Sequence, residues 1–285
     1  MTSSTLHVAS GLASIEVLPV LLLLAAGAAL VLVGARRGRP SPLRPLPAAL
    51  AVCALLVAVH PDAAAVAEES LTGHMLQHLL LMTAVPALLA WSRAPLALVW
   101  ALPRGVRVRA ARPLLRRWSR PATGAALVAL FAASLWVWHV PALYDRALDS
   151  AALHAAEHAT LLAASLGLWA HVALLAEGPA HRRLLAAAWL VAAMFPMLAL
   201  GAVLTFARTL VYPAHAEAAR LAGLAPFADQ EVGGLLMLMP SGLVHVGVAL
   251  GLFASTLRPR RGAAPGREAG AVDGPRAAHS IDGTP

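Results

Sequence analysis

Long apolar runs, separated by short segments that carry nearly all the charges, dominate the sequence. A membrane-spanning helix needs about 20 mainly apolar residues, and seven runs approach or exceed that length. They lie at about 15–34, 46–60, 71–91, 122–140, 151–176, 184–207 and 232–257. The run at 46–60 is the weakest, because three prolines crowd its start, and it could instead be a buried or tilted partial span. The pattern predicts an all-α fold: a polytopic membrane helix bundle of about seven transmembrane helices.

The arginines gather in alternate connecting segments. All 22 basic residues are arginine, and most lie at 35–45, 92–121, 177–183 and beyond 257, whereas the other connections hold most of the 14 acids. Because short cytoplasmic loops are enriched in arginine and lysine, this alternation predicts an N-terminus outside and a cytoplasmic C-terminus. We expect one seven-helix domain at 1–257 and a disordered cytoplasmic tail at 258–285, which is polar and rich in Ala, Gly and Pro.

The amino-acid composition also indicates a membrane protein and not a soluble one. The chain is 59% hydrophobic and 13% charged, whereas a soluble domain carries about 25% charged residues. The net charge of +8 does not indicate nucleic-acid binding, because the arginines lie in loops between apolar runs. The loop at 92–121 could contact lipid headgroups, although a topology anchor is the simpler interpretation. With Cys53 as the single cysteine, any soft-metal chemistry must use histidine, methionine or a partner's thiols.

Two histidine pairs open two of the apolar runs. His74 and His78 lie four residues apart in G-H-M-L-Q-H, and His154 and His158 have the same spacing in L-H-A-A-E-H. Side chains at i and i+4 share one helix face. With the predicted topology, both pairs lie at matching depths, about 5 and 10 Å below the outer ends of their helices. His139 closes the run at 122–140 on the same side.

These residues predict an outward-facing metal pocket made by His74, His78, His139, His154 and His158. Ionisable groups inside a membrane are functional candidates by default, with satisfied hydrogen bonds between helices as the alternative. Imidazole suits copper, zinc, iron and nickel, and thioether sulfur selects Cu(I). Met75 and Met82 flank the first pair, which favours copper over zinc, although a single methionine is typically core filler.

Three polar side chains could support the ligands. Glu157 lies between His154 and His158 and could orient a histidine through its second nitrogen, as carboxylates do around metal-bound imidazoles. Asp145 could act in the same way at the mouth of the pocket, and Gln77 could hydrogen-bond His78. The alternative for the two acids is a solvated helix end.

The remaining histidines are assigned elsewhere. His215 lies in an outer loop and is interpreted as an ordinary loop residue, while His60, at the end of the run 46–60, is undecided between ligand and bystander. His171 follows His158 by 13 residues and faces another side of the helix. His245, deep in the last run, could form a hydrogen bond between helices or act as a deeper transfer ligand.

Three stretches carry a recognisable series of motifs. They are H-M-L-Q-H-L-L-L-M at 74–82, W-H-V-P-A-L-Y-D-R-A-L at 138–148 followed by H-A-A-E-H at 154–158, and D-Q-E-V-G-G-L-L-M-L-M-P-S-G at 229–242. In this order they resemble the caa3-type cytochrome c oxidase assembly factors, the Bacillus-type CtaG family, from about 46 to 257. The resemblance implies a multi-pass protein of the bacterial cell (inner) membrane that helps to form active oxidase by supplying copper to its centres. The partners it implies are cytochrome c oxidase subunits, with periplasmic copper chaperones as further candidates, alongside membrane lipid.

The sequence thus predicts a non-enzymatic assembly factor that holds copper and delivers it to an oxidase. Three alternatives stay open. A copper transporter would need a ligand path to the inner side of the membrane. A membrane cytochrome would hold haem between histidines of different helices. A zinc-dependent membrane hydrolase would use Glu157 as its base.

Overall fold

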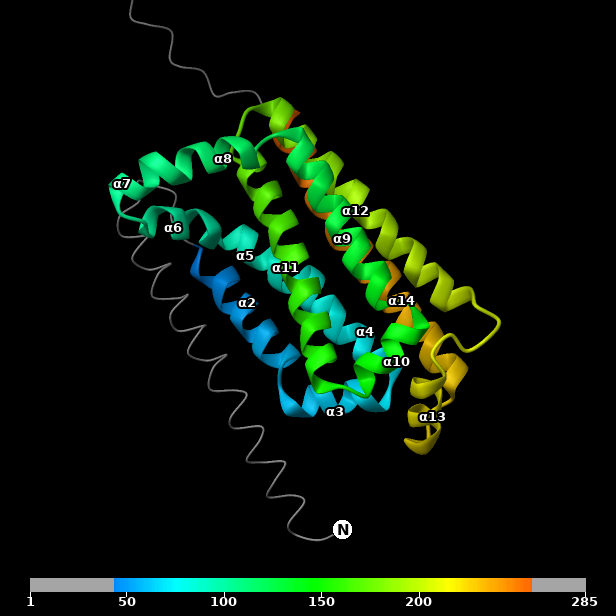
Figure 1. Cartoon of the computed structure of the whole chain (residues 1–285). Helices are drawn as coiled ribbons and strands as arrows, with labels where there is room; N and C mark the ends of the chain where they lie inside the picture. The colour runs from blue at the N-terminus through cyan, green and yellow to red at the C-terminus, as the bar shows by residue number, and fades with distance from the viewer. Residues whose placement is uncertain (1–43, 258–285) are drawn as a thin grey trace, which may run out of the picture.

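The computed structural model describes residues 44–257, and every element in this range is a helix (Figure 1). Five helices are long and apolar enough to cross a membrane: Leu71–Ser92, α9 (Pro121–Trp138), α11 (Ala151–Ala176), α12 (Ala180–Phe206) and α14 (Pro226–Leu257). A sixth candidate is the pair α2 (Pro45–Ala58) and α3 (Pro61–Glu69), which is bent by 56°. The run predicted at 15–34 and the tail predicted at 258–285 lie outside the described residues. The all-α fold is confirmed for the described part, which has five to six candidate membrane spans; the count of about seven stays a prediction.

The helix Leu71–Ser92 is continuous but irregular. It consists of α4 (Leu71–Leu79), a π-helical turn η1 (Leu80–Ala84) and α5 (Val85–Ser92). The wide turn precedes Pro86, which has no N–H to donate to the preceding turn. A π turn accommodates the missing hydrogen bond without ending the helix, so α4 and α5 form one span. Arg93 then ends it in the left-handed conformation (φ 65°).

The two helices that carry the histidine pairs begin in the same way. The Ser70 hydroxyl accepts a hydrogen bond from Gly73 N (3.1 Å) at the start of α4, and the Ser150 hydroxyl accepts one from Leu153 N (3.4 Å) at the start of α11. Serine is a favoured N-cap because its side chain satisfies one of the free N–H groups of the first turn. Each cap lies four residues before the first histidine of its pair, so both pairs occupy the opening turns of their helices.

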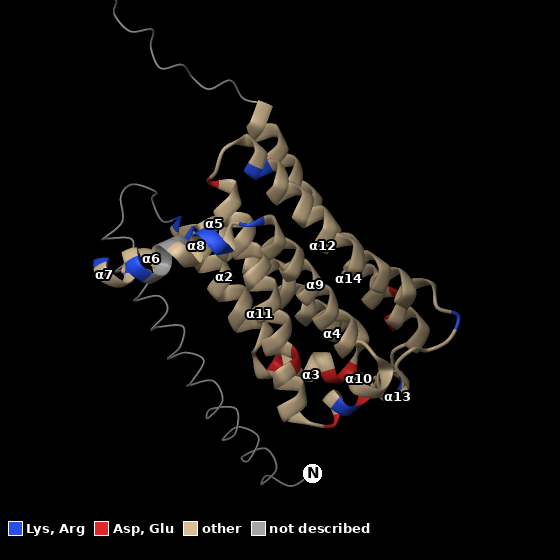
Figure 2. Ribbon diagram, turned by 45° about the horizontal axis from the view of Figure 1, so that its top comes forward, with Lys and Arg blue, Asp and Glu red and all other residues tan. Residues whose placement is uncertain are grey.

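Short helices close the two ends of the bundle differently. The helices α3, α10 (Pro141–Leu148) and α13 (Pro213–Leu221) lie at one end and together form what we call the cap (Figure 1). At the other end lie α6 (Ala94–Ala101), α7 (Arg104–Val106) and α8 (Arg112–Trp118), where arginines are concentrated (Figure 2). The predicted separation of arginine-rich and acidic connections is therefore present along the bundle. The side of the membrane that each end faces stays a prediction.

Helices α12 and α14 approach most closely at two glycines. A Cβ atom on Gly201 would lie 2.8 Å from the Gly234 carbonyl oxygen, and one on Gly234 would lie 2.6 Å from Thr205 N. Real Cβ atoms are not found this close to a backbone. Small residues at such crossings let two membrane helices pack backbone against backbone. This crossing supports the first turns of α14, and α14 in turn contacts α4.

We expect Gly234→Ala to destabilise the protein by about 1–3 kcal/mol, the usual cost of forcing an extra carbon into a packed core. Thermal unfolding in detergent would measure the effect as a lower melting temperature. Gly247→Ala is the matched control on the same helix, since a Cβ atom there has no neighbour within 4 Å in the described structure. Equal melting temperatures for the two variants would show that the crossing is not tight.

Candidate metal centre

The two histidine pairs converge at the cap end of the bundle. The ring centroids lie 4.4 Å apart for His74 and His78 on α4, and 4.2 Å apart for His154 and His158 on α11. Between the helices, the His74 ring lies 5.5 Å from His154, and the His78 ring lies 5.4 Å from His158. The rings therefore face one another, as their shared spacing and depth predicted, instead of pointing outward to lipid.

His139 joins the group from a third helix. It follows the last residue of α9, and its ring centroid lies 5.3 Å from that of His78. Its Nδ1 lies 2.7 Å from the Leu135 carbonyl oxygen. Since a carbonyl can only accept, the proton is on Nδ1 and the Nε2 lone pair is free, which is how metal-binding histidines are held. Burial lowers the pKa of His139, against the opposing effects of this hydrogen bond and of Glu157, and so favours the neutral ring that binds metals.

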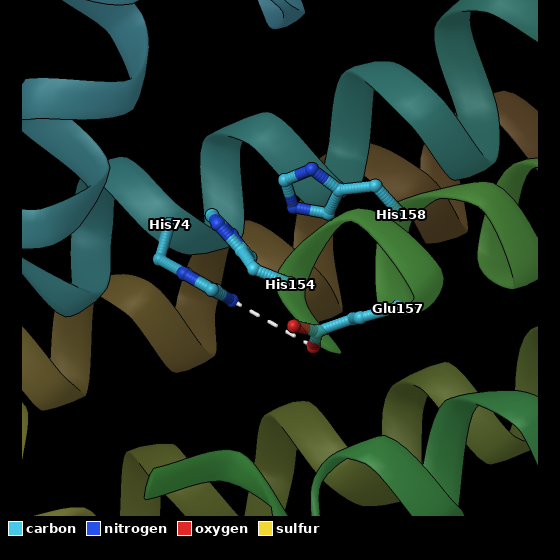
Figure 3. A group of neighbouring side chains, drawn as sticks. All are labelled: His74, His154, Glu157 and His158. Atoms are coloured by element: carbon cyan, nitrogen blue, oxygen red, sulfur yellow. Dashed lines mark ion pairs between the residues drawn. The ribbon is translucent and has the colours of Figure 1, made fainter. Parts of the chain in front are cut away.

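Glu157 points its carboxylate into the group, toward His74 (Figure 3). Its side chain is 0% exposed, and Oε1 lies 3.4 Å from His78 Nε2 and 3.8 Å from His74 Nε2. One donor atom from each of four side chains falls within 4.8 Å of the others, and these side chains are His74, His154, Glu157 and His158. We expected Glu157 to support a ligand. Its position makes it a candidate ligand itself.

The donor atoms of this group are buried and unpaired. Among the described residues, no hydrogen-bond partner is found for His74 Nδ1 and Nε2, His78 Nδ1 and Nε2, His139 Nε2, His154 Nε2, His158 Nε2, or Glu157 Oε1 and Oε2. Buried polar atoms in folded proteins nearly always have a partner, because an unpaired one costs about 1–3 kcal/mol. So many unpaired donors and acceptors at one place make this group a candidate site for an ion.

The pocket is less open than the sequence suggested. A shallow, exposed site was expected, but the cap covers the group and the donor atoms are buried. His154 and His158 are partly exposed as residues, although their Nε2 atoms are buried. The physical reason is that the connections between the spans fold into helices across the opening.

His215 is part of this cover, and its interpretation as an ordinary loop residue was wrong. It lies on α13 with 1% of its surface exposed, and its ring centroid is 5.4 Å from that of His74. Nε2 lies 2.7 Å from the Ala67 carbonyl oxygen, so this nitrogen carries the proton, and Nδ1 accepts from the Tyr144 hydroxyl at 2.7 Å. With both nitrogens occupied, His215 joins the three cap helices α3, α10 and α13 and is not free to bind a metal.

Two tyrosines missed by the sequence reasoning complete the cover. Tyr144 and Tyr212 are stacked with ring centroids 3.9 Å apart, and the Tyr144 ring lies 5.1 Å from that of His74. Burial raises the pKa of Tyr144, which keeps its hydroxyl protonated and able to donate to His215. The Tyr212 hydroxyl donates to the His139 carbonyl oxygen (3.0 Å), which fixes the backbone of a cluster residue.

The other predicted site residues lie around the group. Gln77 Nε2 donates to the Ala58 carbonyl oxygen (2.6 Å) and ties α4 to the end of α2. Asp145 is half-buried on α10. Met75 and Met82 are fully buried in the hydrophobic core beside the histidines. Roles of these four residues in metal binding stay predictions.

The remaining histidines lie apart from the group. His60 caps α3 by accepting from Asp62 N (3.2 Å), and His171 lies in the core beside Gly124. His245 Nδ1 bonds the Ser241 carbonyl oxygen of its own helix (2.8 Å). The expected hydrogen bond between helices is therefore replaced by one within α14, while the ring packs 5.3 Å from that of Trp169.

Comparison with known proteins identifies the family of the chain. The family model described as cytochrome c oxidase caa3 assembly factor (Caa3_CtaG) matches residues 28–259. That match covers most of the chain, including all the residues of the histidine group. The chain belongs to the cytochrome c oxidase caa3 assembly factor family. The search of curated proteins and the search of solved structures each found no match.

In this caa3 assembly factor, the D-Q motif holds the first histidine helix in place. The Asp229 carboxylate accepts from Leu71 N (2.7 Å) and Thr72 N (3.0 Å), so it caps α4 from the start of α14. Gln230 accepts from Val211 N (2.7 Å) and donates to the Thr209 carbonyl oxygen (3.1 Å). Charge-assisted bonds to a helix N-terminus are among the stronger ones in proteins. The motif therefore sets the position of His74 and His78 without touching them.

Asp229→Ala is expected to lower the stability of the assembly factor by about 1.5–3 kcal/mol, because it leaves two N–H groups of α4 without their charged acceptor. The melting temperature of the purified protein would report the loss. Glu68→Ala, which removes an exposed acid from α3, is the control and should change nothing measurable. If both variants melt alike, the cap at Asp229 contributes little.

The donor set of the assembly factor fits a first-row transition metal. Imidazole nitrogen suits copper and zinc, and among divalent ions the usual order of affinity places copper highest. Four donors from two helices match the coordination number that such ions take in proteins. The residues that would hold an ion are His74, His154, Glu157 and His158, with His78 and His139 beside them.

Proposed function

We propose that this caa3 assembly factor binds copper in the buried histidine group at the cap end of the bundle and passes it to a cytochrome c oxidase subunit. One observation carries the proposal: histidines from three helices and a buried carboxylate gather in one place with their donor atoms unpaired. The family supports the oxidase as the partner. Copper fits both the nitrogen-rich donor set and a terminal oxidase as recipient.

The arrangement favours copper over haem. A haem lies as a flat plate between its axial ligands, whereas these histidine rings contact one another, with neighbouring centroids 4.2–5.5 Å apart. A macrocycle could enter only if the helices moved apart. The same rings can share a small ion after rotations of their side chains.

Handover follows from the unequal burial of the ligands. His154 and His158 are partly exposed as residues, whereas His74 and Glu157 are buried. An incoming donor of the recipient can therefore reach the side of the group formed by α11. We propose that each bond to the exposed histidines is replaced in turn by a bond to the recipient, while the buried ligands hold the ion until transfer is complete. Release in this way needs no catalytic turnover.

A transfer experiment tests the function. Purified protein loaded with copper would be mixed with copper-depleted caa3-type oxidase, separated from it, and both analysed for metal. We expect copper to move to the oxidase from the wild-type protein, and copper that stays with the assembly factor would reject delivery.

A separate uptake assay tests the transporter alternative. Copper that appears inside sealed vesicles containing only this protein would identify a transporter.

A further inference from the structure

The histidine group offers more donors than one ion can use. A copper or zinc ion in a protein site takes about four ligands, and His74, His154, Glu157 and His158 supply four with their donor atoms within 4.8 Å of one another. His78 and His139 are left over. Both are buried, and in the described part of the chain neither His78 nitrogen nor His139 Nε2 has a hydrogen-bond partner.

The two remaining histidines form a position of their own. Their ring centroids are 5.3 Å apart, and the rings are inclined by 72°. His139 presents a free Nε2, because its Nδ1 is bound to the Leu135 carbonyl oxygen. The Glu157 carboxylate lies 3.4 Å from His78 Nε2, so this second position also has an acidic oxygen within reach.

Glu157 lies close to residues of both positions. Its Oε1 is 3.8 Å from His74 Nε2 and 3.4 Å from His78 Nε2. A carboxylate has two oxygens and about four lone-pair directions, so it can bind two ions at once. The two ions of such a site in proteins lie about 3.5–4 Å apart.

We propose that the site binds two copper ions, one held by His74, His154 and His158 and the other by His78 and His139, with Glu157 bridging them. This inference rests on the proposed function and adds the number of ions and their separate ligands. The first position includes the partly exposed residues His154 and His158, whereas His78 and His139 of the second position are both buried. The two ions therefore differ in access, and a chelator removes the first much faster than the second.

Copper counting combined with electron paramagnetic resonance tests the proposal. The full-length protein in detergent would be loaded with Cu(II), desalted, and analysed for copper per chain and for unpaired spins per copper. We expect two copper ions per chain but far fewer unpaired spins than copper ions. The reason is that two bridged Cu(II) ions couple magnetically, which cancels much of their spin signal. His139→Ala and His154→Ala should each retain one copper, now with a full spin signal. His245→Ala removes a buried histidine with a free Nε2 outside the group and should keep two coupled ions.

The outcomes separate this inference from the function on which it rests. A single copper with full spin intensity in the wild type, lost in His154→Ala but kept in His139→Ala, would overturn the two-ion site and leave the copper function standing. No bound copper in the wild type would reject both. Should His139→Ala fail to fold, judged by gel filtration and circular dichroism, His139→Asn takes its place, and the wild-type copper and spin counts decide independently.

Discussion

Replacing His74 and His78 together by alanine is expected to abolish copper binding. Both rings are fully buried on α4 and face His154, His158 and Glu157. Loss of even a supporting residue lowers metal affinity by about 10–100-fold, so loss of two ligands should lower it by more than about 100-fold. Metal analysis of the purified variant after loading and desalting would measure this directly.

The control for that variant replaces two exposed histidines. His60 and His181 lie outside the group and are exposed, so His60→Ala with His181→Ala removes the same number of imidazoles and should keep the copper. A cavity left by two missing rings could weaken folding on its own. The pair His74→Asn and His78→Asn leaves smaller cavities and should bind no copper either, and copper retained by both double variants would rule out this group as the site.

Glu157→Gln is expected to separate metal binding from folding. A buried carboxylate is expensive unless it is paired, and no hydrogen-bond partner for either carboxylate oxygen of Glu157 is found among the described residues. The amide removes that charge, so the metal-free variant should be at least as stable as the wild type. With one donor lost and the charge gone, copper affinity should fall by at least about 10–100-fold.

Melting temperatures with and without copper would show this effect. Copper should raise the melting temperature of the wild-type protein, because a ligand that binds only the folded state stabilises it, and this rise should shrink or vanish in Glu157→Gln. Glu177→Gln changes a carboxylate just beyond the far end of α11, where it pairs with Arg93 (2.9 Å), and should keep the full rise. A purely structural role of Glu157 would instead lower the melting temperature of the metal-free variant.

The core of the site could be predicted from the sequence because it depends on local helix geometry. The spacing of four residues puts each histidine pair on one face, and the apolar runs that follow place both pairs at the same end of their helices. Antiparallel order of successive spans then brings the ends of α4, α9 and α11 together. Topology and helix periodicity were enough to predict that His74, His78, His139, His154 and His158 lie close together; their binding of a metal stays a prediction.

The cover of the site could not be predicted in the same way. His215 contacts Tyr144 and Ala67, which are separated from it by 71 and 148 residues, and no periodic pattern connects short helices across such distances. Their positions depend on how three connections fold over the end of the bundle. The motif at 138–148 contains Tyr144 next to Asp145, so the sequence pointed to this segment of the cover, but Tyr144 was assigned no role.

Glu157 and Asp229 show a second limit of sequence reasoning. Both acids lie in the motifs that carry the family resemblance, yet their roles depend on which neighbour each side chain faces. Glu157 turns into the histidine group, whereas Asp229 turns to the start of α4 and caps it. Only the packed structure shows that the Glu157 carboxylate is buried without a hydrogen-bond partner among the described residues, as expected of a candidate ligand, whereas the Asp229 carboxylate accepts two backbone N–H groups as a helix cap.

X-ray absorption at the copper edge of the loaded, purified protein tests the central claim most directly. We predict that the first coordination shell of the copper consists of nitrogen and oxygen at about 2.0 Å, and that the spectrum shows the multiple-scattering pattern of several imidazoles. The same spectrum would show whether Met75 or Met82 contributes sulfur. A first shell dominated by sulfur, or a spectrum without imidazole scattering, would contradict copper binding by the histidines of α4, α9 and α11.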